Sequence, residues 1–560
     1  MSMPKQSTIR NDWYNVVQEY TERLVKIRSV SPGEGEIRVA HEVLRQLTEG
    51  DVGSLYTMHG LDPIEGDPYQ RQNAYAFLHG QSSATLVLLG HIDTVDTQDY
   101  GPLEPWALEP NELTLRKKAL FSSPTAAEEA DDDWMFGRGA IDMKSGVAVN
   151  IALMRRLAQA NHQSPLPLSV VMLATPDEEN ESAGVLQAVH FLLRLRELYG
   201  LEYLGVINTD STTALYPGDQ QRYIYSGTIG KLLPCFLCVG SASHVATPFN
   251  GLDANLLAAE LIRELSMNDS LCDVAQGQVT APPVTLHAKD LKDHYDVQLP
   301  FAAYFYLNVL TLNTGPDELL QRLCACSSTV MRDLLQRVDQ AEQRWRQASG
   351  EHGWQERFQP RHGSVLTYAQ LYTEAVKQLG EDQVQAALDA EWQRASSLPD
   401  ARERSLCLAQ RLWKLSNRQG PAVVIFYAPP YYPHVAPTPG ALQDAISNVV
   451  AAHPEIPLEI LPYYPYLSDM SYLRLDPGIN LSAFTQNMPI WQESGTQAQI
   501  GAYKLPLAEI QKLALPVINW GPYGYAFHQR DERVLKSYSF ETLPQLIYET
   551  IMYLAQNSAS

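Results

Sequence analysis

Short apolar runs alternate with amphipathic segments along the first 210 residues of the chain. Continuous apolar runs predict buried strands at residues 85–90 (TLVLLG), 168–174 (LSVVMLA) and 204–208 (LGVIN). Apolar residues at helical spacing predict amphipathic helices at residues 13–27, 37–50, 143–160 and 182–198. Strands of the same kind return at 458–464 and 515–522. This pattern predicts an α/β fold with a mostly parallel sheet that helices cover on both faces.

The middle of the chain has a different pattern. Residues 222–338 predict the order strand, helix, strand, strand, helix, which is typical of a small α+β sandwich. Residues 340–417 are helical in pattern, charged and rich in Gln and Arg, and a strand with a proline-rich exit follows at 421–433. Because the first pattern returns afterwards, we expect a larger domain in two parts, 1–217 and 431–560. The smaller domain, 218–430, would be inserted between them, with an extra helical insertion at about 340–417.

Composition narrows the possible partners. The chain has 560 residues, 45% of them hydrophobic, and a formal net charge of −22. This acidic balance argues against nucleic acid or an anionic membrane as a partner, since both bind clustered Lys and Arg. No apolar run approaches the roughly 20 residues that span a bilayer, and the N-terminus has no apolar signal segment. Six cysteines are few for this length, and a cytoplasmic location is expected. Cys235 and Cys238 form a CxxC inside an apolar run, which favours buried thiols over a zinc site.

Ionisable residues follow each of the first three predicted strands. His91 and Asp93 end the first, Asp177, Glu178 and Glu179 follow the second, and Asp210 follows the third. Asp142 stands just before a predicted helix. Each residue alone is ordinary, because a strand-end Asp is often a helix cap and a Glu pair is often a solvated edge. In an open α/β sheet, however, the carboxyl ends of parallel strands form one rim where ligands bind.

This set of side chains predicts a metal site. Carboxylates that are packed together repel one another unless a cation joins them. Nitrogen and oxygen ligands without thiolates suit zinc, cobalt or manganese. Five potential ligands are too many for one tetrahedral site, whereas two ions that share a bridging carboxylate would use them all.

Five motifs carry a resemblance to a known family. They are GHIDTV (90–95), GRGAIDMKSG (137–146), TPDEENESAG (175–184), GTIGK with GSASHVATPFNGLDAN (227–231 and 240–255), and WGPYGYAFHQRDERV (520–534). In this order they resemble the dinuclear zinc hydrolases that include carboxypeptidase G, aminoacylase, acetylornithine deacetylase and succinyl-diaminopimelate desuccinylase. Within that family, FYAPPYYPH (426–434) and YYPYLSDMSYL (463–473) are most similar to the bacterial arginine-utilization proteins of the Roc type.

The resemblance implies a role for each site residue. His91 and Asp210 would bind one zinc ion, Glu179 and His528 would bind the other, and Asp142 would bridge them. Asp93 would orient His91, and Glu178 would be the general base and acid. His244, from a small domain of the lid or dimerisation type, would donate to the oxyanion, often across a homodimer interface. The peptide bond from Asp142 to Met143 would be cis.

The predicted activity is metal-dependent hydrolysis of C–N amide bonds in N-acyl amino acids or short peptides. A water molecule between the two ions would be the nucleophile, and the Roc-type resemblance points to arginine or ornithine catabolism. One alternative is a non-catalytic binding or regulatory protein with the same fold. Another is a phosphoesterase, which would need Arg or Lys at the rim, and only Arg138 and Lys144 lie near the motifs. The insertion leaves the residue that binds the substrate carboxylate and the oligomeric state open.

Overall fold

The computed structural model describes residues 7–120, 133–350, 362–492 and 502–557. The chain divides into two compact units. Unit 1 consists of Met1–Thr228, Val435–Leu475 and Pro506–Ser560, and unit 2 of Ile229–His434 and Asp476–Leu505. The described residues 476–492 and 502–505, which the sequence pattern placed with the larger domain, therefore belong to unit 2. The contacts explain this, because the backbone N–H of Tyr427 donates to the carbonyl of Asn487 (2.7 Å) and the ring of Phe484 packs on Tyr431.

An eight-stranded sheet forms the centre of unit 1. Its strand order is β1-β2-β5-β3-β6-β17-β7-β16. The strands are β1 (Met58–Pro63), β2 (Gln72–Leu78), β3 (Ala84–His91), β5 (Ser169–Thr175), β6 (Glu202–Asn208), β7 (Arg222–Tyr225), β16 (Leu458–Leu461) and β17 (Val517–Asn519). The neighbours β5, β3, β6 and β17 run parallel, while β1 and β2 form an antiparallel hairpin that joins the sheet beside β5. The hairpin was not predicted from the sequence.

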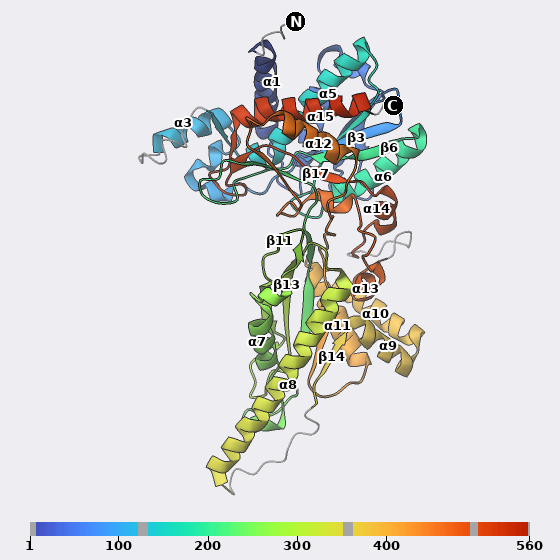
Figure 1. Cartoon of the computed structure of the whole chain (residues 1–560). Helices are drawn as coiled ribbons and strands as arrows, with labels where there is room; N and C mark the ends of the chain where they lie inside the picture. Colours follow the sequence, from blue (N-terminus) through green and yellow to red (C-terminus); the bar gives the residue numbers. More distant parts are fainter. Residues whose placement is uncertain (1–6, 121–132, 351–361, 493–501, 558–560) are drawn as a thin grey trace. The chain divides into compact units, whose positions relative to one another are not determined.

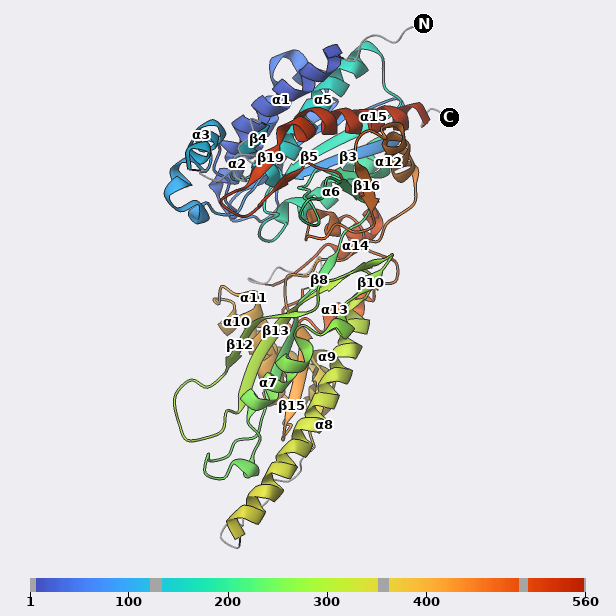
Figure 2. The ribbon, with the colours of Figure 1, turned by 60° about the vertical axis from the view of Figure 1, so that its left-hand side comes forward.

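Helices cover both faces of this sheet (Figures 1 and 2). Helices α1 (Ser7–Val25), α5 (Ser145–Gln163) and α15 (Leu543–Asn557) lie on one side, and α6 (Ala183–Tyr199) lies on the other. Unit 1 also contains α2 (Glu34–Thr48), α3 (Pro110–Leu120), α12 (Ala441–Ala452) and α14 (Leu507–Leu513). The central strands β3 and β5 are almost wholly buried, which explains their continuous apolar sequence. The expected α/β class is confirmed.

A small sheet carries the last of the expected site residues in unit 1. Its three strands, in spatial order, are β18 (Gly524–Tyr525), β19 (Arg533–Leu535) and β4 (Trp134–Phe136). The turn between β18 and β19 contains His528. Strands of two or three residues are too short to give a periodic pattern, so the sequence alone did not predict this sheet.

Unit 2 is built on a sheet with the main order β12-β13-β9-β15-β14. These strands are β9 (Pro234–Val239), β12 (Val284–Asp290), β13 (Ala302–Thr311), β14 (Ser364–Thr367) and β15 (Ala422–Tyr427), and β8 (Gly230–Leu232) pairs with β13. Cys235 and Cys238 are buried in β9, as expected. A separate pair, β10 (Val274–Ala275) and β11 (Gln278–Val279), forms a two-stranded sheet.

Unit 2 also contains α-helices. They are α7 (Ala254–Leu265), α8 (Pro316–Ser349), α9 (Tyr368–Leu379), α10 (Glu381–Ala395), α11 (Ala401–Leu415) and α13 (Leu481–Gln486). The described part of the insertion at 340–417, which leaves out residues 351–361, is mainly helical as expected, except that Ser364–Thr367 forms β14 and pairs in parallel with β15. Four residues in a charged, helical context give too short a signal for a sequence prediction. Among the described residues, no helix is both long enough and apolar enough to cross a membrane.

Candidate functional site

The parallel strands β3, β5 and β6 bring the expected site residues of unit 1 to one rim. His91, the last residue of β3, is in register with Thr175, the last residue of β5. Glu178 and Glu179 follow β5, and Asp210 follows β6. Helix α5 starts against the end of β6, and only a glycine fits there, because a Cβ on Gly146 would lie 2.0 Å from the carbonyl oxygen of Thr209.

Asp142 lies between two imidazoles. Its Oδ1 is 3.0 Å from His91 Nε2, and its Oδ2 is 3.2 Å from His528 Nε2. Each oxygen of this carboxylate therefore faces a different histidine. The peptide bond from Asp142 to Met143 is cis, which confirms that prediction.

His528 also contacts Glu179, with 2.8 Å between Nε2 and Oε1. Its pKa is raised to about 11, since burial opposes the charge but the hydrogen bonds to Asp142 and Glu179 outweigh it. His91, Asp142 and Glu179 each offer one ligand atom, and these atoms lie within 4.8 Å of one another. Residues that are hundreds of positions apart thus form one cluster.

Asp93 lies beside His91 and under the loop after β5. Its Oδ1 is 3.5 Å from His91 Nδ1, and its two oxygens accept the backbone N–H groups of Glu178 (3.2 Å) and Glu179 (3.0 Å). Strand alternation places His91 and Asp93 on the same side of the chain. Asp93 therefore contacts both the imidazole and the backbone of the glutamate pair.

Glu178 and Asp210 complete the acidic rim. Glu178 Oε2 lies 4.0 Å from His91 Nε2. Burial raises the pKa of Glu178 well above its ordinary value, and the charges of Glu179, Asp469 and Asp210 raise it further. Burial, together with the charge of Asp142, raises the pKa of Asp210 to about 7. The side chains are packed so closely that their negative charges oppose one another.

Asp469 is a buried carboxylate at this rim that the sequence analysis did not single out. It begins the short helix η7 (Asp469–Tyr472), and its Oδ2 accepts a hydrogen bond from the hydroxyl of Thr175 (3.1 Å). Burial raises its pKa to about 8. The residue lies in the segment YYPYLSDMSYL, which had been noted for its resemblance, but nothing in the local sequence shows that Asp469 is buried next to Glu178.

His244 belongs to unit 2, so the cluster in unit 1 does not include it. It lies exposed in the loop between β9 and α7, and its Nδ1 accepts the backbone N–H of Ala246 (3.1 Å). Its role remains a prediction.

The residues at the rim fit divalent ions. Among the described residues, no Lys or Arg forms an ion pair with Asp142, Glu178, Glu179 or Asp210, and their close neighbours are imidazoles and other carboxylates. Two ions with a charge of +2 each would offset this crowding of negative charge. The donors are nitrogen and oxygen atoms, which zinc, cobalt and manganese accept.

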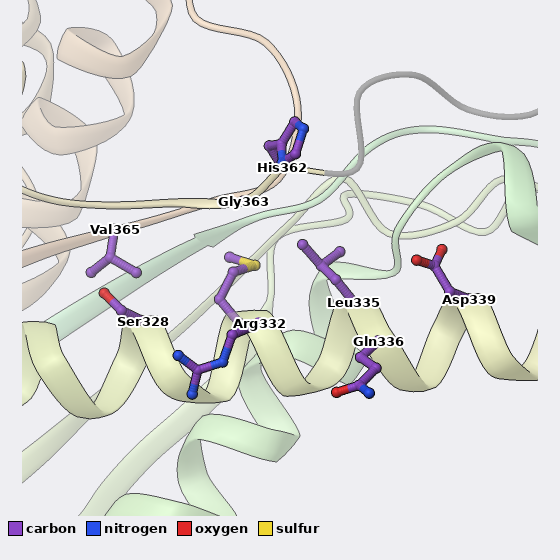
Figure 3. Close-up of a pocket in the computed structure, with 9 residues that line it drawn as sticks. Ser328, Arg332, Leu335, Gln336, Asp339, His362, Gly363 and Val365 are labelled. Atoms are coloured by element: carbon purple, nitrogen blue, oxygen red, sulfur yellow. The ribbon is translucent and has the colours of Figure 1, made fainter.

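Unit 2 contains a separate hollow of about 360 Å³ between α8 and residues 362–365. Figure 3 shows that Arg332, Asp339 and His362, three of its polar side chains, point in different directions rather than toward one centre. This hollow lacks the convergent donors that the rim of unit 1 has.

Comparison with known proteins identifies the family. The sequence profile of peptidase family M20/M25/M40 matches residues 87–485. Two proteins of Bacillus subtilis (strain 168) are similar: the uncharacterized protein YqjN is 35% identical over 485 residues, 85% of each chain, and protein RocB is 32% identical over 558 residues, 97% of this chain and 95% of RocB. Aminopeptidase PepT from Bacillus cereus ATCC 10987 shares the fold, with a TM-score of 0.53 at 12% identity over 97% of this chain and 99% of PepT. The predicted family and its Roc-type branch are confirmed: the chain belongs to peptidase family M20/M25/M40 and is a metal-dependent hydrolase.

Proposed function

We propose that the protein hydrolyses a C–N amide bond in an N-acyl amino acid or a short peptide, with two divalent ions at the rim of unit 1. The observation that supports this most strongly is the position of Asp142, whose two oxygens face His91 and His528 separately. A carboxylate held in this way is suited to bridge two ions, each of which has one imidazole ligand.

We assign the remaining ligands by their partners. His91 and Asp210 would bind one ion, and Glu179 and His528 the other. Zinc is the leading candidate, and cobalt or manganese would fit the same donors. Asp93 would keep the imidazole of His91 in place, because its carboxylate lies beside Nδ1.

Glu178 would be the general base and acid. When bound, the two ions would lower the pKa of a water molecule and polarise the substrate carbonyl. Glu178 lies at the rim beside His91 and is not hydrogen-bonded to His528, which contacts Glu179 instead. Its carboxylate could therefore accept the proton that the attacking water releases and pass it to the leaving nitrogen. His244 would donate a hydrogen bond to the developing oxyanion.

The contacts of the nearby basic residues argue against a phosphoesterase. Arg138 is buried, and its guanidinium pairs with Glu532 (2.6 Å) and Asp99 (2.6 Å). Lys144 is also buried, and its ammonium donates to the carbonyl of Ile27 (2.8 Å). Neither side chain is available to hold a phosphate group. A purely binding or regulatory protein would not need Glu178 beside an intact set of ligands.

The similarity to RocB supports a derivative of a basic amino acid as the substrate, within arginine or ornithine catabolism. The strongly acidic balance of the chain is compatible with a cationic substrate. We also propose that the protein forms a homodimer through unit 2.

The test is hydrolysis by metal-free protein supplied separately with zinc, cobalt or manganese. N-acyl-arginine and N-acyl-ornithine are compared with neutral and acidic N-acyl amino acids and with dipeptides, and Glu178→Gln is the matched inactive control. We expect turnover that requires metal, is lost in the variant and is fastest with basic substrates. A preference for acidic substrates would refute the link to basic amino acids. If protein that holds two ions per chain cleaved no amide or peptide, the hydrolase proposal itself would be wrong.

A further inference from the structure

Arg71 lies behind the loop that contains Glu178 and Glu179, and its guanidinium is buried among three carboxylates. It stands just before β2, and the residue is 4% exposed. Two nitrogen atoms of its guanidinium donate to the same oxygen of Asp67: Nη2 lies 2.7 Å and Nε 3.1 Å from Oδ1. Nη1 contacts Asp177, and Glu36 of α2 lies 3.4 Å away. The guanidinium is therefore fixed in one orientation by partners from three separate segments.

Asp177 connects Arg71 to the loop. Besides Arg71, its Oδ1 accepts the hydroxyl of Ser31 (2.9 Å) and the side-chain amide of Asn180 (3.2 Å). Its Oδ2 accepts the backbone N–H of Ala183 (3.1 Å), at the start of α6. Asp177 itself has a positive φ of 75°, a conformation that is uncommon for non-glycine residues, although Asp adopts it more readily than most.

The glutamate pair is thus held from two directions. On one side, Asp93 accepts the backbone N–H groups of Glu178 and Glu179. On the other side, Arg71 holds Asp177, the residue immediately before them. The backbone between these two attachments has little freedom, so the directions of the Glu178 and Glu179 side chains depend on both.

We propose that Arg71 is a positioning residue for the reaction: through Asp177 it sets the places of Glu178, the proposed base, and Glu179, the proposed metal ligand. The proposal rests on the function proposed above for these two glutamates. Arg71 does not contact the ligand cluster, and we do not assign it a contact with the substrate. It acts through the backbone of the loop. Supporting residues of this kind commonly change metal affinity or activity by 10–100-fold when they are removed.

A simple structural ion pair would behave differently. Arg194 provides the comparison, because it joins α6 to the same β1–β2 hairpin through Asp62 (2.7 Å) but does not contact residues 176–182. Loss of either pair could lower overall stability. Only loss of the contact between Arg71 and Asp177 should make the loop with Glu178 and Glu179 more mobile and weaken metal binding by the ligand cluster.

The experiment compares Arg71→Met and Arg71→Lys with the control Arg194→Met. Hydrogen exchange of the backbone amides of residues 178–183 is measured first in metal-free protein, which makes this readout independent of activity. Metal affinity, by competition with a chelator, and kcat and KM are then measured. Arg71→Lys retains the charge but loses the planar fork, so it should fold even if Arg71→Met does not.

We expect Arg71→Met to speed hydrogen exchange in this loop by about tenfold or more and to weaken metal binding by about 10–100-fold. The fold-decrease in kcat should be larger than the fold-change in KM. Arg71→Lys should show smaller changes of the same kind, and Arg194→Met none of them. Loop exchange and metal affinity like those of the wild-type protein in both Arg71 variants would overturn the proposal. So would equal effects in Arg194→Met. Hydrogen exchange in the loop is measured without substrate. Its result therefore tests the role of Arg71 separately from the proposed hydrolase activity, and the failure of one proposal can be told from the failure of the other.

Discussion

At the scale of single residues, two adjacent glutamates have different partners. The backbone N–H groups of Glu178 and Glu179 both donate to Asp93. Their side chains diverge, however: Glu179 contacts His528 at 2.8 Å, and Glu178 lies 4.0 Å from His91. The same side-chain chemistry in consecutive positions can therefore serve two roles.

This divergence predicts different losses on substitution. Glu178→Gln should retain nearly all of the bound metal and lower kcat by about a hundredfold or more, because the amide cannot accept the proton. Glu179→Gln should lose metal, because it removes a charged ligand of one ion. Metal analysis of each purified variant beside its kinetics checks both statements. Equal loss of metal in the two variants would show that base and ligand have been assigned wrongly.

The sequence could predict the residues of the cluster and one supporting residue, Asp93, but not the supporting residues Asp469 and Arg71. His91, Asp142, Glu179 and His528 stand in motifs, and the carboxyl ends of parallel strands had to meet at one rim. Asp469 and Arg71 have no such signal. Their importance comes from partners far away in the chain, such as Thr175 and Asp177, and from burial that appears only once the chain has folded.

At the scale of elements, a carboxylate organises the connection from β13 to α8. Oδ2 of the buried Asp273 accepts three consecutive backbone N–H groups, from Leu312 (2.8 Å), Asn313 (2.9 Å) and Thr314 (2.7 Å). Burial by itself would raise the pKa of Asp273, but these hydrogen bonds outweigh it and hold the pKa below its ordinary value. The turn therefore prefers the charged carboxylate.

Asp273→Asn should destabilise unit 2 by about 1–3 kcal/mol at pH 7, because the charged acceptor of three donors is lost. A lowered pKa in the folded state gives stability that is present above the unfolded value of about 4 and is lost as the pH falls below it. The difference between wild type and variant should therefore narrow below about pH 4. Urea unfolding across this pH range measures it, with the exposed Asp269→Asn as control. A difference that does not change with pH would contradict the assigned role of the charge.

The elements that the sequence missed share a physical cause. The predicted strands at 85–90, 168–174 and 204–208 are long apolar runs, and they correspond to β3, β5 and β6. In contrast, β14, β18 and β19 have two to four residues each, and they are recognised as strands only by their hydrogen bonds to partner strands in the folded chain. The hairpin of β1 and β2 has mixed polarity, so its sequence did not stand out from a loop.

At the scale of the whole molecule, unit 2 presents an unpaired strand edge. β12 is the first strand of its sheet, and within the part of the chain that the structure describes it pairs only with β13. Its side chains Val284 and Leu286 are 43% and 53% exposed. Exposed apolar edge strands tend to pair with a second chain, and a two-fold dimer is the commonest result.

We therefore expect a mass of twice 62.6 kDa in size-exclusion chromatography with light scattering. Leu286→Lys should shift the protein toward the monomer, since a charge on the edge opposes pairing. Leu198→Lys, at a leucine of α6 in unit 1 that is even more exposed (72% against 53%), should leave the mass unchanged. A monomeric wild-type protein, or a dimer unaffected by Leu286→Lys, would show that β12 is not the interface.

The discontinuity of unit 1 also sets an order of events during protein synthesis. A ribosome translates β3, β5 and β6 first, then Ile229–His434 and Asp476–Leu505, and residue 528 only afterwards. Throughout that interval the growing chain contains Asp142 and Glu179 without the imidazole of His528, which contacts both of them in the finished fold. If His528 is a metal ligand, as proposed above, the nascent polypeptide has an incomplete ligand set during this interval, and we expect full loading with metal to follow translation. The order of the codons by itself delays the appearance of a working hydrolase until unit 2 has been made.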